Sequence, residues 1–188
     1  MKYNTEMVDH LIMNRRTIKK FKAIEVNINE IIDLLEIAKW SPNFRLTEPW
    51  RFLIFTGEGK EKFVDAYKSS QILENGDIPQ KVQKRAEHFS SIPMHIVVLM
   101  AEDERQKEWE EDYGAVCSLI QNFQILAWSR GIGMVWRTNE WIDNPIFKNK
   151  LSIKSNEKIV ATLMVGYPET IPKPKPRTSI KEKIKIIR

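Results

Sequence analysis

The sequence predicts one α/β or α+β domain with a central sheet, followed by an extended C-terminal arm. Its 188 residues are enough for one sizeable core, and 42% hydrophobic with 29% charged residues is typical of a globular protein. Short apolar segments alternate with segments in which apolar residues recur at helical spacing. From residue 171 onward proline alternates with basic residues, which favours an extended chain over a helix. We therefore assign residues 1–170 to the domain and residues 171–188 to the arm.

Four segments are predicted to be strands, because each is short, apolar and rich in β-branched or aromatic residues. They cover residues 50–56, 96–100, 134–136 and 159–165. Gly57 closes the first segment and Pro93 precedes the second, so turn residues flank both. The connections between the segments are long enough for helical crossovers, which is why one central sheet is expected.

Helical periodicity predicts helices between and around these strands. They cover residues 7–14, 28–38, 58–69, 79–89 and 104–130. Asn27 followed by Glu30 predicts a capping box at the second helix, and Gly131 is placed to end the longest. Asn144 with Pro145 predicts a further helix start, because asparagine caps well and proline is favoured in the first turn.

The net charge of +5 and the pI near 9.2 are compatible with an anionic partner but do not identify one. Cys117 is the single cysteine, which excludes an internal disulfide and fits a reducing compartment. The chain has neither an apolar leader core nor an apolar run of membrane-spanning length, so we expect a cytoplasmic protein without a membrane partner. The three histidines and the cysteine lack metal-ligand spacing, and no metal is expected.

Residues 15–21, the basic segment, read Arg-Arg-Thr-Ile-Lys-Lys-Phe and place four cations and a hydroxyl in six residues. Arginine offers a planar fork of donors and lysine a movable point charge, so the set suits a phosphorylated ligand. The alternative is a solvated basic loop. Lys175 and Arg177, held apart by Pro176, form a second basic pair that suits either a phosphate clamp or a solvated tail.

Residues 40–50, the aromatic loop, surround hydrogen-bonding residues with two tryptophans, a phenylalanine and two prolines. Aromatic faces beside fixed polar groups suit a flat heteroaromatic ligand. The alternative is a helix-to-strand connection whose aromatic residues fill the core. Residues 131–138 add two glycines, which permit close backbone approach, and Trp136, for which a core position is the favoured interpretation.

Other chemistries have little support in the sequence. The glycine spacings of a Rossmann fingerprint and of a P-loop are absent, and so is the Gly-x-Ser-x-Gly elbow of hydrolases. Cys117 lies on the apolar face of a predicted helix and is expected to be unreactive. The acidic residues between positions 108 and 112 are interpreted as the polar face of the same helix.

Taken in chain order, five segments resemble the nitroreductase family of FMN-dependent oxidoreductases. They are residues 15–21, 38–44, 48–52, 131–137 and 165–168, and the resemblance extends over residues 8–178. It implies a mostly antiparallel sheet flanked by helices, in an intertwined homodimer that binds FMN at its interface. It also implies that the arm crosses to the partner subunit, so that the two subunits exchange their C-terminal arms.

The resemblance implies a cofactor site to which both subunits contribute. Its residues in this sequence would be Arg15, Arg16, Thr17, Lys19, Trp40, Pro42, Asn43, Phe44, Thr47, Trp136, Arg137, Thr138, Lys175 and Arg177. Arg15 and Thr17 would bind the FMN phosphate or ribityl chain, and the basic pair of the arm would close on the phosphate. Lys19 would lie near flavin N1 and the C2 carbonyl, where a cation stabilises the charge that develops on reduction. No side chain is expected to be catalytic, because flavin N5 carries the chemistry.

The implied activity is ping-pong hydride transfer from NAD(P)H to a flat, electron-poor acceptor such as a nitroaromatic or a quinone. A flavin-fragmenting or dehalogenating relative with the same fold is one alternative. A flavin-holding sensor without turnover is another, and a basic binding module that uses residues 173–188 on an acidic partner or nucleic acid is a third. Nucleic acid is not expected as a partner, because the aromatic residues lack an RNA-reading pattern.

Overall fold

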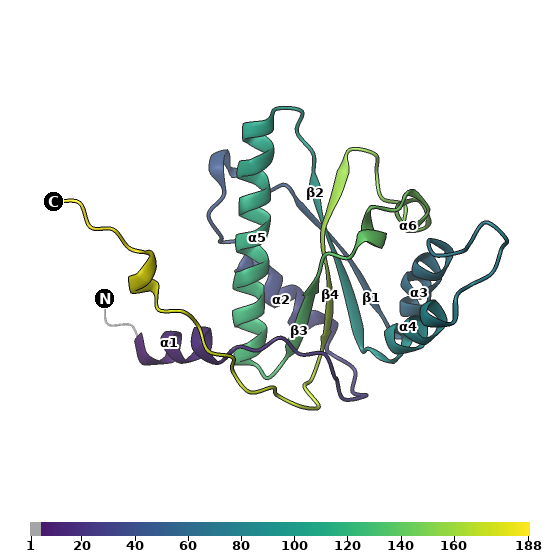
Figure 1. The fold of residues 1–188 in the computed structure, drawn as a ribbon, viewed down its shortest axis with the longest axis horizontal. Coiled ribbons are helices and arrows are strands. Elements are labelled where there is room, and N and C mark those ends of the chain that lie inside the picture. The colour runs from purple at the N-terminus through teal and green to yellow at the C-terminus, as the bar shows by residue number, and fades with distance from the viewer. Residues whose placement is uncertain (1–4) are drawn as a thin grey trace.

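The computed structural model describes residues 5–188 and has a four-stranded antiparallel sheet at its centre (Figure 1). Strands β1 (Trp50–Thr56), β2 (Met94–Ala101), β3 (Gly133–Arg137) and β4 (Glu157–Gly166) stand in the order β1-β2-β4-β3. Every neighbouring pair is antiparallel. All four predicted strands are confirmed, and three of them extend one or two residues further at each end. The α+β fold with a mostly antiparallel sheet is confirmed as well.

Helices surround this sheet within the described residues. They are α1 (Thr5–Asn14), α2 (Ile28–Ala38), α3 (Lys60–Ser69), α4 (Gln80–Ser91), α5 (Gln106–Ser129) and α6 (Pro145–Lys150), with 3-10 turns η1 (Phe44–Leu46), η2 (Gly57–Gly59), η3 (Glu140–Asp143) and η4 (Ile180–Lys183). Asn27 and Asn144 cap their helices as predicted, but the capping box at α2 is incomplete, because the Glu30 carboxylate lies 3.8 Å from Arg130 Nε and does not return a bond to the Asn27 amide. Asn27 accepts from the Asn29 amide at 2.9 Å, and Asn144 accepts from the Ile146 amide at 2.8 Å. Gly131 has a φ of 74° and follows the last turn of α5, as a C-terminal glycine does.

α1 begins two residues earlier than predicted, at Thr5, and two helices begin two residues later than predicted. α3 begins at Lys60 rather than at residue 58, because Gly57 has a φ of 53° and the chain makes a 3-10 turn before the helix. α5 begins at Gln106 rather than at residue 104. The Asp103 carboxylate accepts from both the amide and the guanidinium of Arg105, and these bonds hold Arg105 in an extended conformation.

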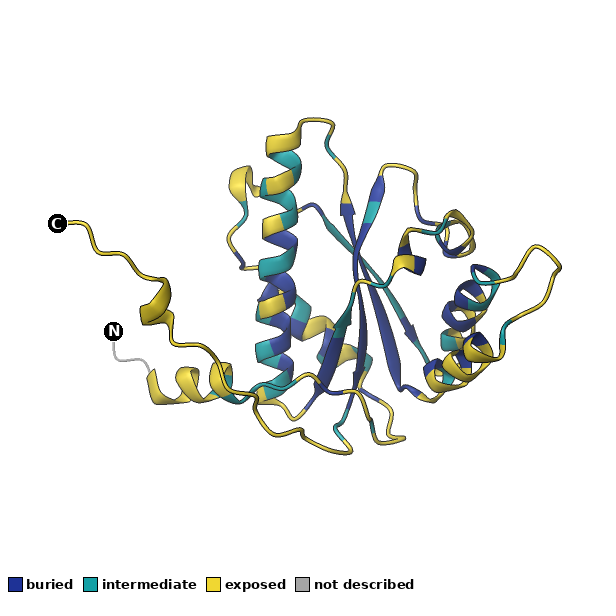
Figure 2. Cartoon of the chain, viewed as in Figure 1, coloured by how far each residue is buried: buried dark blue, intermediate teal, exposed yellow. Residues whose placement is uncertain are grey.

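The sheet separates two hydrophobic cores, with α2 and α5 on one face and α3, α4 and α6 on the other (Figures 1 and 2). We call the core beneath α2 and α5 the first core and the one beneath α3, α4 and α6 the second core. Successive strand residues point to opposite faces, so Ile96 and Val98 enter the first core while Val97 and Leu99 enter the second. The second core is aromatic, with ring centroids 4.9 to 6.0 Å apart. Its rings belong to Phe63, Tyr67, Phe89, Trp141 and Phe147.

Both ends of the described chain lie on the surface, as the yellow segments of Figure 2 show. α1 buries none of its residues, and every residue from 169 to 188 is exposed. The arm nevertheless carries apolar side chains, namely Ile171, Ile180, Ile184, Ile186 and Ile187. β1 pairs with β2 alone, so its outer edge is unpaired within the described residues. Exposed apolar groups and an open strand edge are typical of an association surface.

No helix within residues 5–188 is both long and apolar enough to span a bilayer.

Candidate functional site

The basic segment lies along the start of β3. Thr17 forms a parallel bridge with Met134, and the Ile18 amide donates to the Met134 carbonyl at 3.1 Å. Ile18 is fully buried, whereas Thr17 and Lys19 on either side of it are exposed. Because the segment is extended here, one side chain anchors it to the core while the hydroxyl and the ammonium group remain accessible.

Two glycines let the basic segment come this close to the sheet. Gly133 and Gly166 are partners in the ladder between β3 and β4. A Cβ on Gly133 would lie 2.4 Å from Ile18 Cγ1, and a Cβ on Gly166 would lie 2.9 Å from Phe21 Cδ1. Any larger residue would displace the segment, so glycine is required at both positions. The close backbone approach suggested for residues 131–138 thus occurs at Gly133, and the group that approaches is Ile18 of the same chain.

In the described part of the chain, two arginines of the basic segment and one of the arm have no carboxylate to balance their positive charges. Burial lowers the pKa of Arg15, and the positive charges of Arg16 and Arg177 lower it further. Within residues 5–188, no Asp or Glu forms an ion pair with any of the three. Arg16 also donates to the carbonyls of Met13 and Arg15, at 2.7 and 2.8 Å. Close, uncompensated guanidinium groups are typical of a phosphate-binding site.

The two basic motifs of the sequence therefore influence each other electrostatically within one chain. Arg177 belongs to the arm, yet its charge is close enough to act on Arg15. Lys175, the other member of the arm's basic pair, is exposed.

Trp136, Arg137 and Thr138 follow one another where β3 ends. Trp136 is half-buried, and part of its ring packs against the first core. Arg137 stands opposite Thr162 in the ladder, and its buried Nε has no hydrogen-bond partner within the described residues. Thr138 is exposed. A buried guanidinium N–H without an acceptor is rare and marks a place where a ligand oxygen or a water fits.

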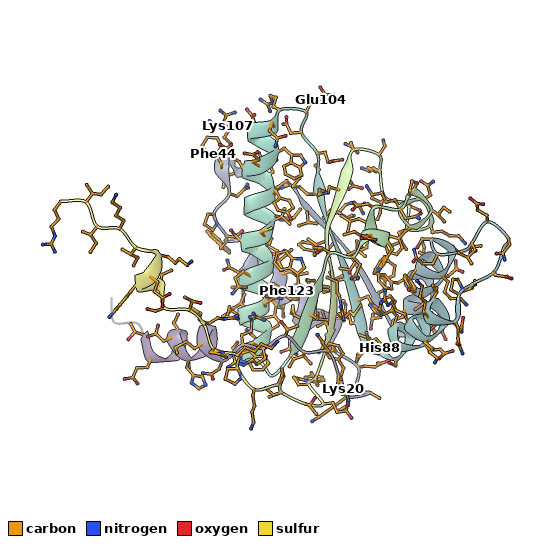
Figure 3. The ribbon with its side chains drawn as sticks, viewed as in Figure 1. Lys20, Phe44, His88, Glu104, Lys107 and Phe123 are labelled. Carbon is orange, nitrogen blue, oxygen red and sulfur yellow. The ribbon has the colours of Figure 1, made fainter. Side chains whose placement is uncertain are left out.

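The aromatic loop projects from the surface beside the N-terminal half of α5. Trp40 and Phe44 are 85% and 52% exposed, so the alternative that the loop's aromatic residues fill the core is wrong for both. Trp50, which is half-buried against the first core, does pack in this way. Figure 3 shows Phe44 near Lys107, at the N-terminal end of α5, and Lys20 of the basic segment at the opposite end of the molecule.

Hydrogen bonds define the shape of the aromatic loop. Asn43 Nδ2 donates to Thr47 Oγ1 at 2.9 Å, and Asn43 Oδ1 accepts from the Glu48 amide at 2.8 Å. Thr47 Oγ1 in turn donates to Asp112 Oδ1 at 2.5 Å. The Thr47 hydroxyl is thus engaged within the chain, and Pro42 is exposed. Sequence reasoning interpreted Asp112 as part of a polar helix face and missed this contact.

The predicted site residues fall into two groups that one chain does not bring together. The first group lies along β3 and the nearby arm: Arg15, Arg16, Thr17, Lys19, Trp136, Arg137, Thr138, Lys175 and Arg177. The second lies in the aromatic loop: Trp40, Pro42, Asn43, Phe44 and Thr47. The loop is tied to Asp112 of α5, whereas Thr17 of the first group pairs with Met134, five residues after α5 ends at Ser129. At 1.5 Å per residue, about 25 Å of helix separates Asp112 from Ser129.

A cavity of about 730 Å³ opens beside Thr138. Its lining includes Gln71, Arg85 and Glu140, of which the sequence assigned none to a site. No local pattern singles out these residues, because α4 and the turns around it carry many polar side chains. Within residues 5–188, no group of three or more His, Cys, Asp or Glu residues is arranged to hold a metal ion.

Comparison with known proteins shows which family this chain resembles. Residues 12–167 match the model described as "Nitroreductase family". The chain is 35% identical over 175 residues to "Putative NAD(P)H nitroreductase YfhC" of Bacillus subtilis, which covers 92% of this chain and 90% of that protein. The crystal structure of a nitroreductase-like family protein from Bacillus cereus is 38% identical and has a TM-score of 0.91, covering 100% of this chain and 98% of that one.

A more distant structure shares the fold. It is that of the FMN-dependent nitroreductase NfnB from Mycobacterium smegmatis in complex with NADPH, with a TM-score of 0.74 at 15% identity, covering 98% of this chain and 99% of that one. The family match over most of the chain, together with the Bacillus relatives, shows that this chain belongs to the nitroreductase family.

Proposed function

We propose that this protein is an FMN-dependent oxidoreductase that transfers hydride from NAD(P)H to a flat, electron-poor acceptor such as a nitroaromatic or a quinone. The observation that carries the proposal is the uncompensated group of Arg15, Arg16 and Arg177 beside the exposed Thr17 and Lys19. The names of the relatives support it, since one is an NAD(P)H nitroreductase by name and another is FMN-dependent and was solved with NADPH.

The charges of the first group fit the phosphate of FMN. Arg15 is partly desolvated and repelled by two other guanidinium groups, so a dianion beside it would offset both effects. Arg137 adds a buried Nε–H donor that still lacks an acceptor. These features are what a tightly held anionic ligand needs, and no carboxylate within the described residues supplies the same charge.

The exposed residues of the basic segment have complementary tasks. Thr17 would donate its hydroxyl to a phosphate or ribityl oxygen, and Lys19 would place its ammonium group at the pyrimidine edge of the flavin. When bound, FMN would supply the atom that accepts hydride from NAD(P)H and passes it to the acceptor, with the two substrates using the site in turn. The protein would bind and orient these molecules and stabilise the negative charge near Lys19.

The site is complete only in a dimer, which is the second part of the proposal. The aromatic loop is about 25 Å of helix away from the arginines, too far to reach the same small ligand within one chain. A second subunit would bring its own aromatic loop to the flavin. The exposed isoleucines of the arm and the unpaired edge of β1 support an exchange of arms between subunits.

An absorption spectrum tests the cofactor and the reaction together. The purified protein should be yellow, and NADH or NADPH should bleach it in the absence of oxygen until a nitroaromatic or quinone restores the colour. A colourless protein that takes up no FMN on titration would contradict the proposal. Tight FMN binding with very slow reduction would favour a sensor, and product analysis after aerobic turnover separates a flavin-fragmenting or dehalogenating enzyme.

Arg15→Ala tests the phosphate site. Loss of a charge-assisted contact should weaken FMN binding by about 1.5–3 kcal/mol, or about 10- to 150-fold in Kd. Lys62→Ala is the matched control, because Lys62 is an exposed cation on α3 outside both groups of site residues. Titration of the apoprotein followed by flavin fluorescence measures both constants. An unchanged FMN Kd in Arg15→Ala, or equal losses in the two variants, would contradict the assignment.

A further inference from the structure

The aromatic loop contains a strained stretch of backbone. Arg45, Leu46 and Glu48 have φ angles of 56°, 52° and 44°, and none of them is glycine. Residues with a Cβ rarely adopt this left-handed conformation, because the Cβ crowds the following carbonyl oxygen. Three such residues within four positions therefore need surrounding interactions that keep the loop in shape.

Burial does not supply those interactions. Phe44 and Leu46 are 52% and 80% exposed, and the Arg45 guanidinium lies 5.0 Å from the centre of the Phe44 ring on the outer surface. The Asn43 side chain bridges the strained residues instead, since it bonds both Thr47 Oγ1 and the Glu48 amide. These two bonds close the loop upon itself, but they do not attach it to the rest of the domain.

Asp112 provides that attachment. Its Oδ1 accepts the Thr47 hydroxyl proton at 2.5 Å, and a charged acceptor makes this a strong hydrogen bond. Asp112 belongs to α5, and the following turns of this helix place Val116 and Ile120 in the first core. The carboxylate is therefore held on a rigid element. A continuous path of hydrogen bonds runs from α5 through Thr47 and Asn43 to the strained backbone.

We propose that Asp112 is a positioning residue for the cofactor site, which holds the aromatic loop through Thr47 so that Phe44 is presented to the flavin of the partner subunit. The inference rests on the proposed function. It also reassigns Thr47, because the hydroxyl expected to contact the cofactor is engaged as a brace between Asn43 and Asp112. In this role Asp112 would act on the position of the loop and would itself contact neither cofactor nor substrate.

Asp112→Ala tests this role, with Asp112→Asn as the conservative variant. The alanine variant should lower kcat/KM for the acceptor about tenfold or more, because small displacements of a positioning group have large kinetic effects. The FMN Kd should stay within about threefold of wild type, since the phosphate is held by the arginines. Asparagine keeps an oxygen for the Thr47 hydroxyl and should recover most of the activity. Asp103→Asn is the matched control, because Asp103 also accepts hydrogen bonds at the start of α5 but does not contact the loop.

A double-mutant cycle with Thr47→Val separates this role from a general loss of stability. Because both residues act through one hydrogen bond, the combined variant should be no slower than the worse single variant. Additive losses, or an Asp112→Ala enzyme with wild-type kcat/KM, would overturn the inference. If Asp112→Ala does not fold, the inference is tested by Thr47→Val alone, and wild-type kcat/KM in that variant would overturn the inference. A wild-type protein that neither binds FMN nor oxidises NAD(P)H would refute the proposed function instead.

Discussion

Gly133→Ala tests whether the close contact between the basic segment and β3 supports both the fold and the cofactor site. The added methyl group would lie 2.4 Å from Ile18 Cγ1, 2.9 Å from Ile18 Cβ and 3.0 Å from Pro168 Cγ. Ile18 is fully buried, and its amide is bonded to the Met134 carbonyl, so neither side chain nor backbone has free space to move into. We expect the basic segment to shift away from β3.

The size of the effect follows from the position of the clash. Overpacking a filled core costs about 1–3 kcal/mol, and the upper part of this range applies because the clash includes a Cβ next to hydrogen-bonded backbone. In a chain of this length each kcal/mol changes Tm by about 2–4 °C, so Tm should fall by about 4–12 °C. Urea unfolding measures the free energy directly. FMN affinity should fall as well, because Thr17 and Lys19 move with Ile18.

Gly114→Ala is the matched control. Gly114 lies within α5, and nothing lies within 4 Å of a Cβ built there, so alanine should stabilise the helix by up to about 1 kcal/mol. Ile18→Ala provides a second check, because it removes the nearest clashing atom and should reduce the cost of Gly133→Ala. Wild-type stability of Gly133→Ala, or strict additivity of Gly133→Ala with Ile18→Ala, would refute the reasoning.

The remaining predictions concern the pH dependence of stability and a half-buried ion pair. Burial lowers the pKa of His95 to about 4 from its ordinary 6.5, so between these values the unfolded chain binds a proton that the folded chain does not. Urea unfolding should show about 2 kcal/mol less stability at pH 5 than at pH 7.5 from this residue, and an unchanged slope in His95→Gln would contradict this. Glu157 accepts two bonds of 2.6 Å from Arg51, which lower its pKa, so its contribution is lost as the pH falls below the ordinary range of glutamate. Glu157→Gln should cost about 1–2 kcal/mol at neutral pH, less than for a fully buried pair because Arg51 is 39% exposed. Asp65→Asn, which breaks an exposed pair, should cost less than about 0.5 kcal/mol, and equal losses would contradict the difference in burial.

Local patterns were sufficient to predict the four strands and most helix ends. β2, for example, could be predicted because its short apolar run, its β-branched residues and its flanking turn residues all lie within about ten positions of one another. Asn27, Gly131 and Asn144 were equally readable, since a cap acts on amides or carbonyls one turn away. The basic segment was noticed for its charge, and the structure adds that Ile18 within it is a core residue.

The remaining features depend on residues that are distant in sequence. Gly133 must be glycine because of Ile18, and no pattern around either residue says that they meet. The Thr47 hydroxyl is engaged by a carboxylate 65 positions later, so it could not be told from a ligand contact. The left-handed backbone at Arg45 and Leu46 has no signal either, because neither residue type favours that conformation.

The two groups of site residues lie toward opposite ends of α5, and this placement has a genetic consequence for the proposed dimer. Each subunit would contribute its arginines to one flavin site and its aromatic loop to the other flavin site. A subunit damaged at Arg15 and a subunit damaged at Phe44 would each form inactive homodimers. In a mixed dimer the two defects would fall on the same flavin, and the second flavin would keep two undamaged halves. Two loss-of-function alleles would thus complement each other.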